Sequence, residues 1–139
     1  MAGHVVEVRP IGHVRSSLTD LDSAPKQGDE GAPDARLDLE PEFLGGLEGI
    51  APGDHVLVLT WLDRARRDVL RVHPRGDQNR PEQGVFSTRS PHRPNPIGLH
   101  RVEVISIDGR SLSVRSLEAL DGTPIVDIKP VLSSDVGER

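Results

Sequence analysis

The residues with the greatest potential for chemistry lie between positions 86 and 98. This stretch reads FSTRSPHRPNPIG and combines three prolines with two arginines, a histidine and an asparagine. Each proline removes a backbone donor and keeps the preceding residue out of the helical region. The backbone is therefore stiff, and it presents Arg89, His92, Arg93 and Asn95 with little entropy left to lose on binding. The stretch predicts either a donor-rich loop for an anionic ligand or a proline-stiffened hairpin that protects a sheet edge.

Positive charge is concentrated around this stretch, although the chain as a whole is acidic. The net charge is -5, yet residues 64–101 carry nine arginines against three acids, a local charge of +6. Arginine recognises phosphates and carboxylates with a planar guanidinium, so Arg75, in loop-like sequence, joins the candidates for anion recognition. Arg66 and Arg67 are interpreted as solvent-facing residues. The basic stretch from Arg64 to Arg101 is a candidate surface for nucleic acid.

Apolar residues recur mainly with a period of two, which is typical of strands. Val56 to Leu62 is apolar except for Thr60 and indicates a strand buried on both faces. Asp108-Gly109 predicts a tight hairpin. One short helical turn is expected at Pro41 to Leu47. The expected strands lie around residues 6–8, 37–39, 56–62, 69–72, 84–88, 99–107, 112–114 and 125–128. About eight short strands predict an all-β fold, a small closed or nearly closed barrel.

The length of 139 residues predicts a single domain with its core at residues 5–132. Residues 18–35 are polar and rich in glycine and proline, and a loop of this length is functional or mobile. The tail at 133–139 is expected to fray. There are no cysteines, which excludes disulfides and thiolate sites. Neither a signal peptide nor a membrane helix is predicted, and a cytoplasmic location is expected.

The sequence offers no familiar fingerprint for a metal or a nucleotide. Its six histidines lack the spacing of a metal site, so no metal is expected. No glycine-rich turn joins a strand to a helix, which excludes a Rossmann-type site. The residues alone do not identify a cofactor.

Four segments, in order, resemble the TsaA-like family of TrmO-type, S-adenosylmethionine-dependent tRNA methyltransferases. They are the proline-rich stretch with its flanks, the opening strand at Ile11 to Ser16, the apolar strand at Asp54 to Leu62, and the closing motif at Asp121 to Pro130. Pro25-Lys26-Gln27 also resembles a Pro-x-Gln element of the family. The resemblance implies a small β-barrel that works as a homodimer and uses S-adenosyl-L-methionine.

The resemblance also assigns residues to the cofactor. Asp63 aligns where the family often has histidine; it either contacts a ribose hydroxyl or the methionine ammonium, or only pairs with Arg64 or Arg66. Gly122 either contacts the cofactor or serves turn geometry alone. Arg75, His92, Arg93 and Asn95 are candidates for the substrate, and no catalytic base is assigned. The residues implied for the cofactor are Pro25, Lys26, Gln27, Asp63, Arg64, Arg89, Leu99, Asp121, Gly122, Thr123 and Pro124.

The function implied is methylation of the exocyclic amine of threonylcarbamoyl-adenosine beside the tRNA anticodon. Bacterial tRNA enzymes of the family usually carry a further C-terminal domain, whereas this chain ends nine residues after Pro130. Two alternatives stay open: a methyltransferase that acts on a small molecule, and a barrel that binds S-adenosylmethionine without catalysis. Turnover separates catalysis from binding, and dependence of turnover on RNA separates the two acceptors.

Overall fold

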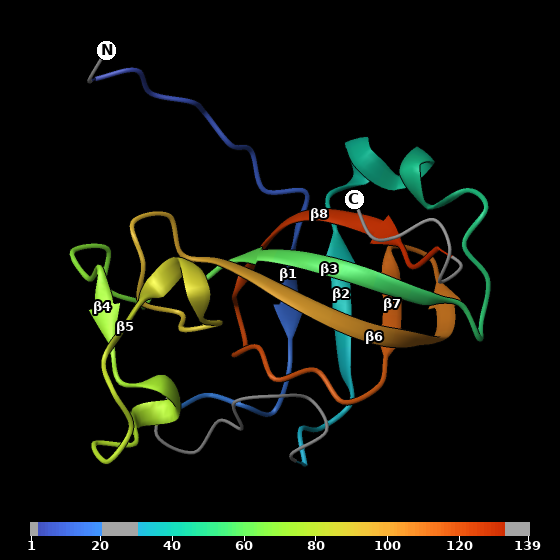
Figure 1. The fold of residues 1–139 in the computed structure, drawn as a ribbon. Coiled ribbons are helices and arrows are strands. Elements are labelled where there is room, and N and C mark those ends of the chain that lie inside the picture. The colour runs from blue at the N-terminus through green and yellow to red at the C-terminus, as the bar shows by residue number, and fades with distance from the viewer. Residues whose placement is uncertain (1–2, 21–30, 133–139) are drawn as a thin grey trace.

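The computed structural model describes residues 3–20 and 31–132, and most of the regular secondary structure within these ranges is β-strand (Figure 1). Six antiparallel strands form a closed barrel in the order β1-β2-β7-β6-β3-β8, and a separate ribbon holds β4 and β5. The strands are β1 (Gly12–Arg15), β2 (Ala35–Leu39), β3 (His55–Trp61), β4 (Arg71–Val72), β5 (Gln83–Gly84), β6 (Ile97–Asp108), β7 (Ser111–Val114) and β8 (Pro124–Pro130), and the short 3-10 helices are η3 (Pro41–Leu47), η4 (Pro74–Gly76) and η5 (Val85–Ser87).

The core fills the barrel because successive side chains of a strand point to opposite faces. Val56 and Val58 of β3, and Val102 and Val104 of β6, are almost completely buried inside the ring. The core also takes residues from β1, β2, β7 and β8: Val14, Ala35, Leu37, Leu39, Leu112, Val114 and Ile125. The predicted all-β class and closed barrel are therefore confirmed, with six strands in the ring and two outside it.

Two local expectations about strands were wrong. Val6 and Val8 were expected in a strand, but they are exposed by 74% and 51% and the first strand starts at Gly12. Every barrel strand already has two neighbours, so the preceding residues have no edge to join. Residues 84–88 pair only at Gly84, since the chain then turns into η5. The short helical segment expected at Pro41–Leu47 is confirmed, as seven residues of 3-10 helix.

One end of the barrel is covered by a segment that links β7 to β8. Strand β6 pairs with β7 only from Val104 onward, so the first half of β6 has no β7 partner. Residues 115–120, called the closing segment, follow β7 there; the amide of Arg115 donates to the carbonyl of Glu103. Leu117, Ala119 and Leu120 of this segment are buried. The closing segment therefore seals the barrel at the end where β6 and β8 begin.

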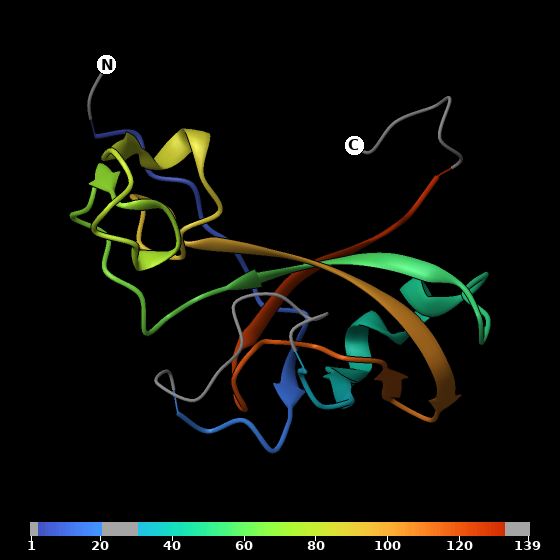
Figure 2. The same cartoon turned by 60° about the horizontal axis from the view of Figure 1, so that its bottom comes forward.

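Residues 62–96, called the lobe, lie beside that same end of the barrel (Figures 1 and 2). Two backbone hydrogen bonds join the start of the lobe to its end: the Leu62 amide donates to the Pro96 carbonyl at 2.8 Å, and the Arg93 amide donates to the Arg66 carbonyl at 3.1 Å. Arg67 adds a brace, because its guanidinium donates to the Pro94 carbonyl at 2.7 Å and to Oδ1 of Asn95 at 3.0 Å. Arg67 is exposed, as interpreted from the sequence, but its bracing role was not predicted.

No helix within residues 3–20 and 31–132 has the length and apolarity needed to span a membrane.

On the outer surface of the barrel, Asp38 joins three strands. Its carboxylate accepts a hydrogen bond of 2.6 Å from the Ser111 hydroxyl, and the guanidinium groups of Arg36 and Arg15 lie 3.3 Å and 3.4 Å away. Burial alone raises the pKa of Asp38, but the Ser111 hydroxyl and the two arginines outweigh it and lower the pKa below the usual 3.8. A carboxyl whose pKa is lowered by folding stabilises the fold above its unfolded pKa.

Asp38→Asn is therefore expected to lower the free energy of unfolding by about 1 kcal/mol at neutral pH. The difference should disappear as the pH falls through the lowered pKa of Asp38, since the wild-type carboxyl is then protonated too. Urea unfolding of both proteins between pH 7 and acidic pH measures this. A difference that stays constant down to the most acidic pH would show that the Asp38 charge is not its source.

Arg67→Ala should loosen the base of the lobe. Exchange of the Arg93 and Leu62 amide protons is expected to become about tenfold faster, because a charge-assisted brace is lost. Arg66→Ala is the matched control, since among the described residues the Arg66 guanidinium pairs only with exposed Asp68, at 3.0 Å. Hydrogen exchange that rises equally in both variants would assign no special role to Arg67.

Candidate functional site

A pocket of about 460 Å³ lies where the lobe meets the start of β6, and it contains the proline-rich stretch. Phe86 and Ile97 form apolar walls of the pocket, and both present this surface to solvent, since they are 79% and 46% exposed. Exposed apolar surface beside guanidinium groups suits a ligand with an aromatic part and an anionic part. The lining residues are Phe86, Thr88, Arg89, Arg93, Pro94, Asn95 and Ile97.

The two arginines of the pocket have different roles. The Arg93 guanidinium donates to the carbonyls of Thr88 and Ser90, both at 3.0 Å, and lies 6.0 Å from the centre of the Phe86 ring. Arg93 therefore shapes the loop. Arg89 is exposed, and within residues 3–20 and 31–132 its guanidinium has no hydrogen-bond or ion-pair partner. Arg89 is accordingly the arginine that is available for an anion.

His92 and Asn95 hold the loop to the base of the lobe. Nδ1 of His92 accepts a hydrogen bond of 3.0 Å from the Arg66 amide, so the neutral ring carries its hydrogen on Nε2. The amide oxygen of Asn95 accepts from Arg67, which leaves its NH2 group as a donor at the pocket. Both residues were predicted to contact substrate, and the structure gives each a bracing role in addition.

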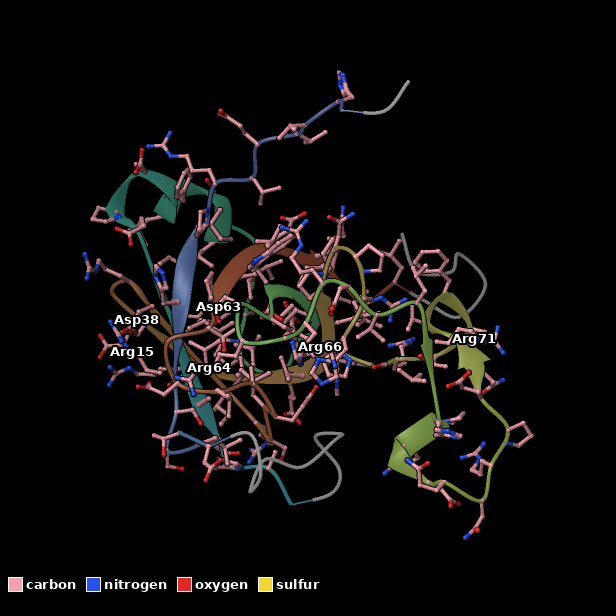
Figure 3. The ribbon with its side chains drawn as sticks, turned by 90° about the vertical axis from the view of Figure 1, so that its left-hand side faces the viewer. Arg15, Asp38, Asp63, Arg64, Arg66 and Arg71 are labelled. Atoms are coloured by element: carbon pink, nitrogen blue, oxygen red, sulfur yellow. The ribbon has the colours of Figure 1, made fainter. Side chains whose placement is uncertain are left out.

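Asp63 and Arg64 follow β3 and lie over the end of the barrel, while Arg71 lies out on the lobe (Figure 3). The Arg64 guanidinium donates to the Thr19 carbonyl at 3.2 Å and so connects this segment to the residues after β1. The Asp63 carboxylate has no partner among the described residues, and Arg66 pairs with Asp68 instead. The pairing of Asp63 with Arg64 or Arg66 is thus absent, and the carboxylate is available for a hydroxyl or an ammonium.

The turn before β8 is held by its own side chains. Oδ1 of Asp121 accepts from the Ser16 amide at 3.0 Å, and the buried Thr123 hydroxyl donates to the Leu120 carbonyl at 2.7 Å. Gly122 has a φ of +84°, a value that side chains rarely adopt, so turn geometry accounts for this glycine. The backbone amides of Asp121 and Thr123 also donate within the protein, to the Leu18 carbonyl at 2.7 Å and the Leu120 carbonyl at 3.1 Å, so they are not available as donors to a ligand.

The other predicted residues are distributed as follows. Leu99 lies on the outer face of β6, is 38% exposed, and continues the apolar wall that begins at Ile97. Arg75 lies in η4 with a φ of 54° and does not line the pocket. Pro25, Lys26 and Gln27 fall outside the described residues. The structure thus brings Arg89, Arg93 and Asn95 into one pocket with Leu99 beside it.

Two features were missed by the sequence reasoning. Phe86 forms a pocket wall, although no role was assigned to it from the sequence. Inside the barrel, His100 lies between Thr60 and Glu118 with contacts of 2.7 Å and 2.5 Å. The signal for it was present, because Thr60 is the one polar residue in the apolar run and His100 occupies an inward position of β6.

A second pocket, of about 440 Å³, opens at the opposite end of the barrel between residues 46–56 and 128–131. It contains none of the predicted site residues. Within the described ranges, no group of three or more His, Cys, Asp or Glu side chains could hold a metal ion. The pocket at the lobe is therefore the candidate site.

Comparison with known proteins places the chain in a family. Residues 13–135 match the family described as the tRNA-methyltransferase O N-terminal domain. A probable S-adenosyl-L-methionine-binding protein of Archaeoglobus fulgidus is 49% identical over 94% of this chain, which spans 35% of that relative. A protein with the same description from Methanothermobacter thermautotrophicus is 45% identical over 94% of this chain and 93% of its own length.

Solved structures agree with this assignment. A crystal structure of TrmO superimposes with a TM-score of 0.74 at 33% identity, covering 95% of this chain and 57% of the solved one. TrmO from Pseudomonas aeruginosa gives 0.73 at 32% identity, with 93% and 57% covered. The chain thus spans little more than half of these solved proteins. The names of the relatives agree with the predicted cofactor, S-adenosyl-L-methionine. Because the family match extends over residues 13–135, the chain belongs to the tRNA-methyltransferase O N-terminal domain family.

Proposed function

We propose that this protein binds S-adenosyl-L-methionine where the lobe meets the barrel and transfers its methyl group to an acceptor. The observation that carries the proposal is the family match over residues 13–135 combined with a pocket built by the proline-rich stretch inside that match. Most residues implied for the cofactor lie at this end of the barrel, on the segments that follow β3, begin β6 and precede β8.

The side chains present fit the chemical groups of this cofactor. Its methionine part has a carboxylate and an ammonium, and its nucleoside part has an aromatic base and ribose hydroxyls. Neither the Arg89 guanidinium nor the Asp63 carboxylate has a partner among the described residues; the first suits the carboxylate of the cofactor, and the second suits its ammonium or a hydroxyl. Phe86, Ile97 and Leu99 offer exposed apolar surface to the base.

Bound S-adenosyl-L-methionine would supply a methyl group on a positively charged sulfur. The acceptor nitrogen would bond to the methyl carbon and lose its proton, and the sulfur would leave in neutral form as S-adenosylhomocysteine. The work left to the protein is alignment and exclusion of water. The braced loop meets the first need, because Arg67 and Arg93 fix the backbone that carries Arg89 and Asn95. Apolar walls at Phe86 and Ile97 meet the second.

The acceptor proposed is the exocyclic amine of threonylcarbamoyl-adenosine beside a tRNA anticodon. Support comes from the description of the family and from the lobe, which carries most of the nine arginines of residues 64–101. Phosphate contacts by such a surface would anchor an RNA while the pocket receives one base. A homodimer, the form implied by the resemblance, would present two such lobes to the RNA.

A second candidate function is binding of S-adenosyl-L-methionine without catalysis. The names of the archaeal relatives favour it, because they record binding alone. His92 also has its Nδ1 occupied by a backbone amide, which removes one candidate for a general base. Measured transfer of labelled methyl groups onto any acceptor would exclude this candidate, and transfer onto a small molecule but not RNA would identify the remaining alternative.

Arg89→Ala is expected to weaken binding of S-adenosyl-L-methionine by roughly 1.5 to 3 kcal/mol, the range for a bond to a charged group. The reason is that no other guanidinium at the pocket lacks a partner among the described residues. Calorimetric titration measures the affinity. Arg80→Ala, an exposed change in the lobe away from the pocket, is the control and should bind as wild type. Equal affinity of Arg89→Ala and wild type would remove Arg89 from the site.

Binding of tRNA should weaken steeply as salt rises. With about six phosphate contacts, affinity is expected to fall roughly a thousandfold between 50 and 200 mM salt. Filter binding of tRNA that carries threonylcarbamoyl-adenosine, together with labelled methyl transfer, measures both properties. Unmodified tRNA is the matched control and should bind but accept no methyl group. Salt-independent binding would contradict the phosphate contacts, and equal methylation of both RNAs would contradict the acceptor.

A further inference from the structure

Three polar side chains form a hydrogen-bonded chain inside the barrel. Oγ1 of Thr60 lies 2.7 Å from Nε2 of His100, and Nδ1 of His100 lies 2.5 Å from Oε1 of Glu118. Thr60 is completely buried, and the side chains of His100 and Glu118 are only 5% and 16% exposed. We call these three residues the internal chain.

The direction of the hydrogen bonds follows from the groups involved. A carboxylate only accepts, so Nδ1 of His100 donates to Glu118. In the neutral ring, Nε2 then accepts from the Thr60 hydroxyl, and every group in the chain is satisfied. No buried side-chain polar atom within the described residues is without a partner.

Gly98 leaves the room that the internal chain needs. It pairs with Thr60 across β3 and β6. A Cβ atom at position 98 would lie 2.3 Å from Oγ1 of Thr60 and 2.7 Å from Nε2 of His100. Such an atom would collide with the hydrogen bond itself. Gly98 is therefore explained by the internal chain rather than by backbone conformation, since its φ is not in the left-handed region.

Stability alone gives no reason for these residues. The core cluster around them is aliphatic, and burying polar groups costs free energy that their hydrogen bonds only offset. A threonine, a histidine and a glutamate could be replaced by apolar groups of similar volume at little cost to the fold. Their presence at one end of the barrel thus indicates a positional role.

The internal chain joins the three segments that carry the proposed cofactor site. Thr60 is the next-to-last residue of β3, three residues before Asp63, and His100 follows Leu99 on β6. Glu118 lies in the closing segment, which leads directly into the turn at residues 121–124. These segments are far apart in the sequence, and the internal chain crosses the interior between them.

We propose that Thr60, His100 and Glu118 are positioning residues that hold the segments of the cofactor site in register from inside the barrel. The proposal rests on the proposed function, since it assigns these residues to the same site. They are buried and do not touch the cofactor, so their effect is on its affinity. The internal hydrogen bonds fix the backbone of the three segments, and that backbone positions the groups on the outer surface that would contact the cofactor.

The test compares substitutions that keep or remove one bond. Thr60→Val has nearly the same shape but no hydroxyl, whereas Thr60→Ser keeps the hydroxyl. Glu118→Gln keeps an oxygen that accepts from His100 but removes the charge. Leu112→Val, a buried change on β7 away from the internal chain, is the control for a general loss of stability.

Calorimetry with S-adenosyl-L-methionine and urea unfolding are measured for all five proteins. Thr60→Val is expected to bind about tenfold more weakly, as after loss of one buried hydrogen bond, with a urea midpoint no lower than that of Leu112→Val. Thr60→Ser and Glu118→Gln should bind within about threefold of wild type, because each keeps a hydrogen bond to His100, through the serine hydroxyl and the glutamine oxygen respectively. Wild-type affinity in Thr60→Val would overturn the proposal, as would an equal loss of affinity in Leu112→Val.

Amide hydrogen exchange without ligand separates this proposal from the proposed function. In Thr60→Val, exchange should accelerate together at residues 62–63, 97–99 and 121–123, and not in β7. If wild-type protein does not bind S-adenosyl-L-methionine, the proposed function fails while exchange still tests the positioning role. Exchange that is unchanged at those three segments would overturn the positioning role itself.

Discussion

Closure of the barrel is the constraint on which the rest of the structure depends. Strand β1 closes the ring by pairing with both β2 and β8, and Gly12 makes the approach possible. A Cβ at Gly12 would lie 2.2 Å from the carbonyl oxygen of Asp38, a backbone atom that cannot move aside. Because the ring is closed, each strand has a neighbour on both sides along at least part of its length, and the segments with unpaired functional groups lie at one end.

At that end, polar side chains lie both inside the ring, in the internal chain, and outside it, at the pocket beside the lobe. The lobe leaves the barrel after β3 and returns at β6. Its first and last residues are held together by the Arg67 side chain and by backbone hydrogen bonds. Braced loops leave Arg89 and Asp63 without partners in the described part of the chain. Partner-free charged groups on a rigid support are what a binding site requires, because little order remains to be imposed when the ligand arrives.

The sequence predicted the fold class, most strands and the site-bearing stretch, because periodicity and proline positions act locally. Val6 and Val8 show the limit: their alternation is typical of a strand, but only the closed ring reveals that no edge is available to them. The bracing role of Arg67 was missed for a similar reason, since its partners at Pro94 and Asn95 are distant in sequence. The internal chain was missed because three positions, 60, 100 and 118, meet only through the barrel.

The most direct test of the account is to map amide chemical shifts of the wild-type protein as S-adenosylhomocysteine, the demethylated form of the cofactor, is added. The account predicts saturable changes at residues 62–64, 86–99 and 121–124, at the end of the barrel that bears the lobe. It predicts no changes around the opposite pocket at residues 46–56 and 128–131. Saturable changes confined to that opposite pocket, or none anywhere, would contradict the central claim that the cofactor binds where the lobe meets the barrel.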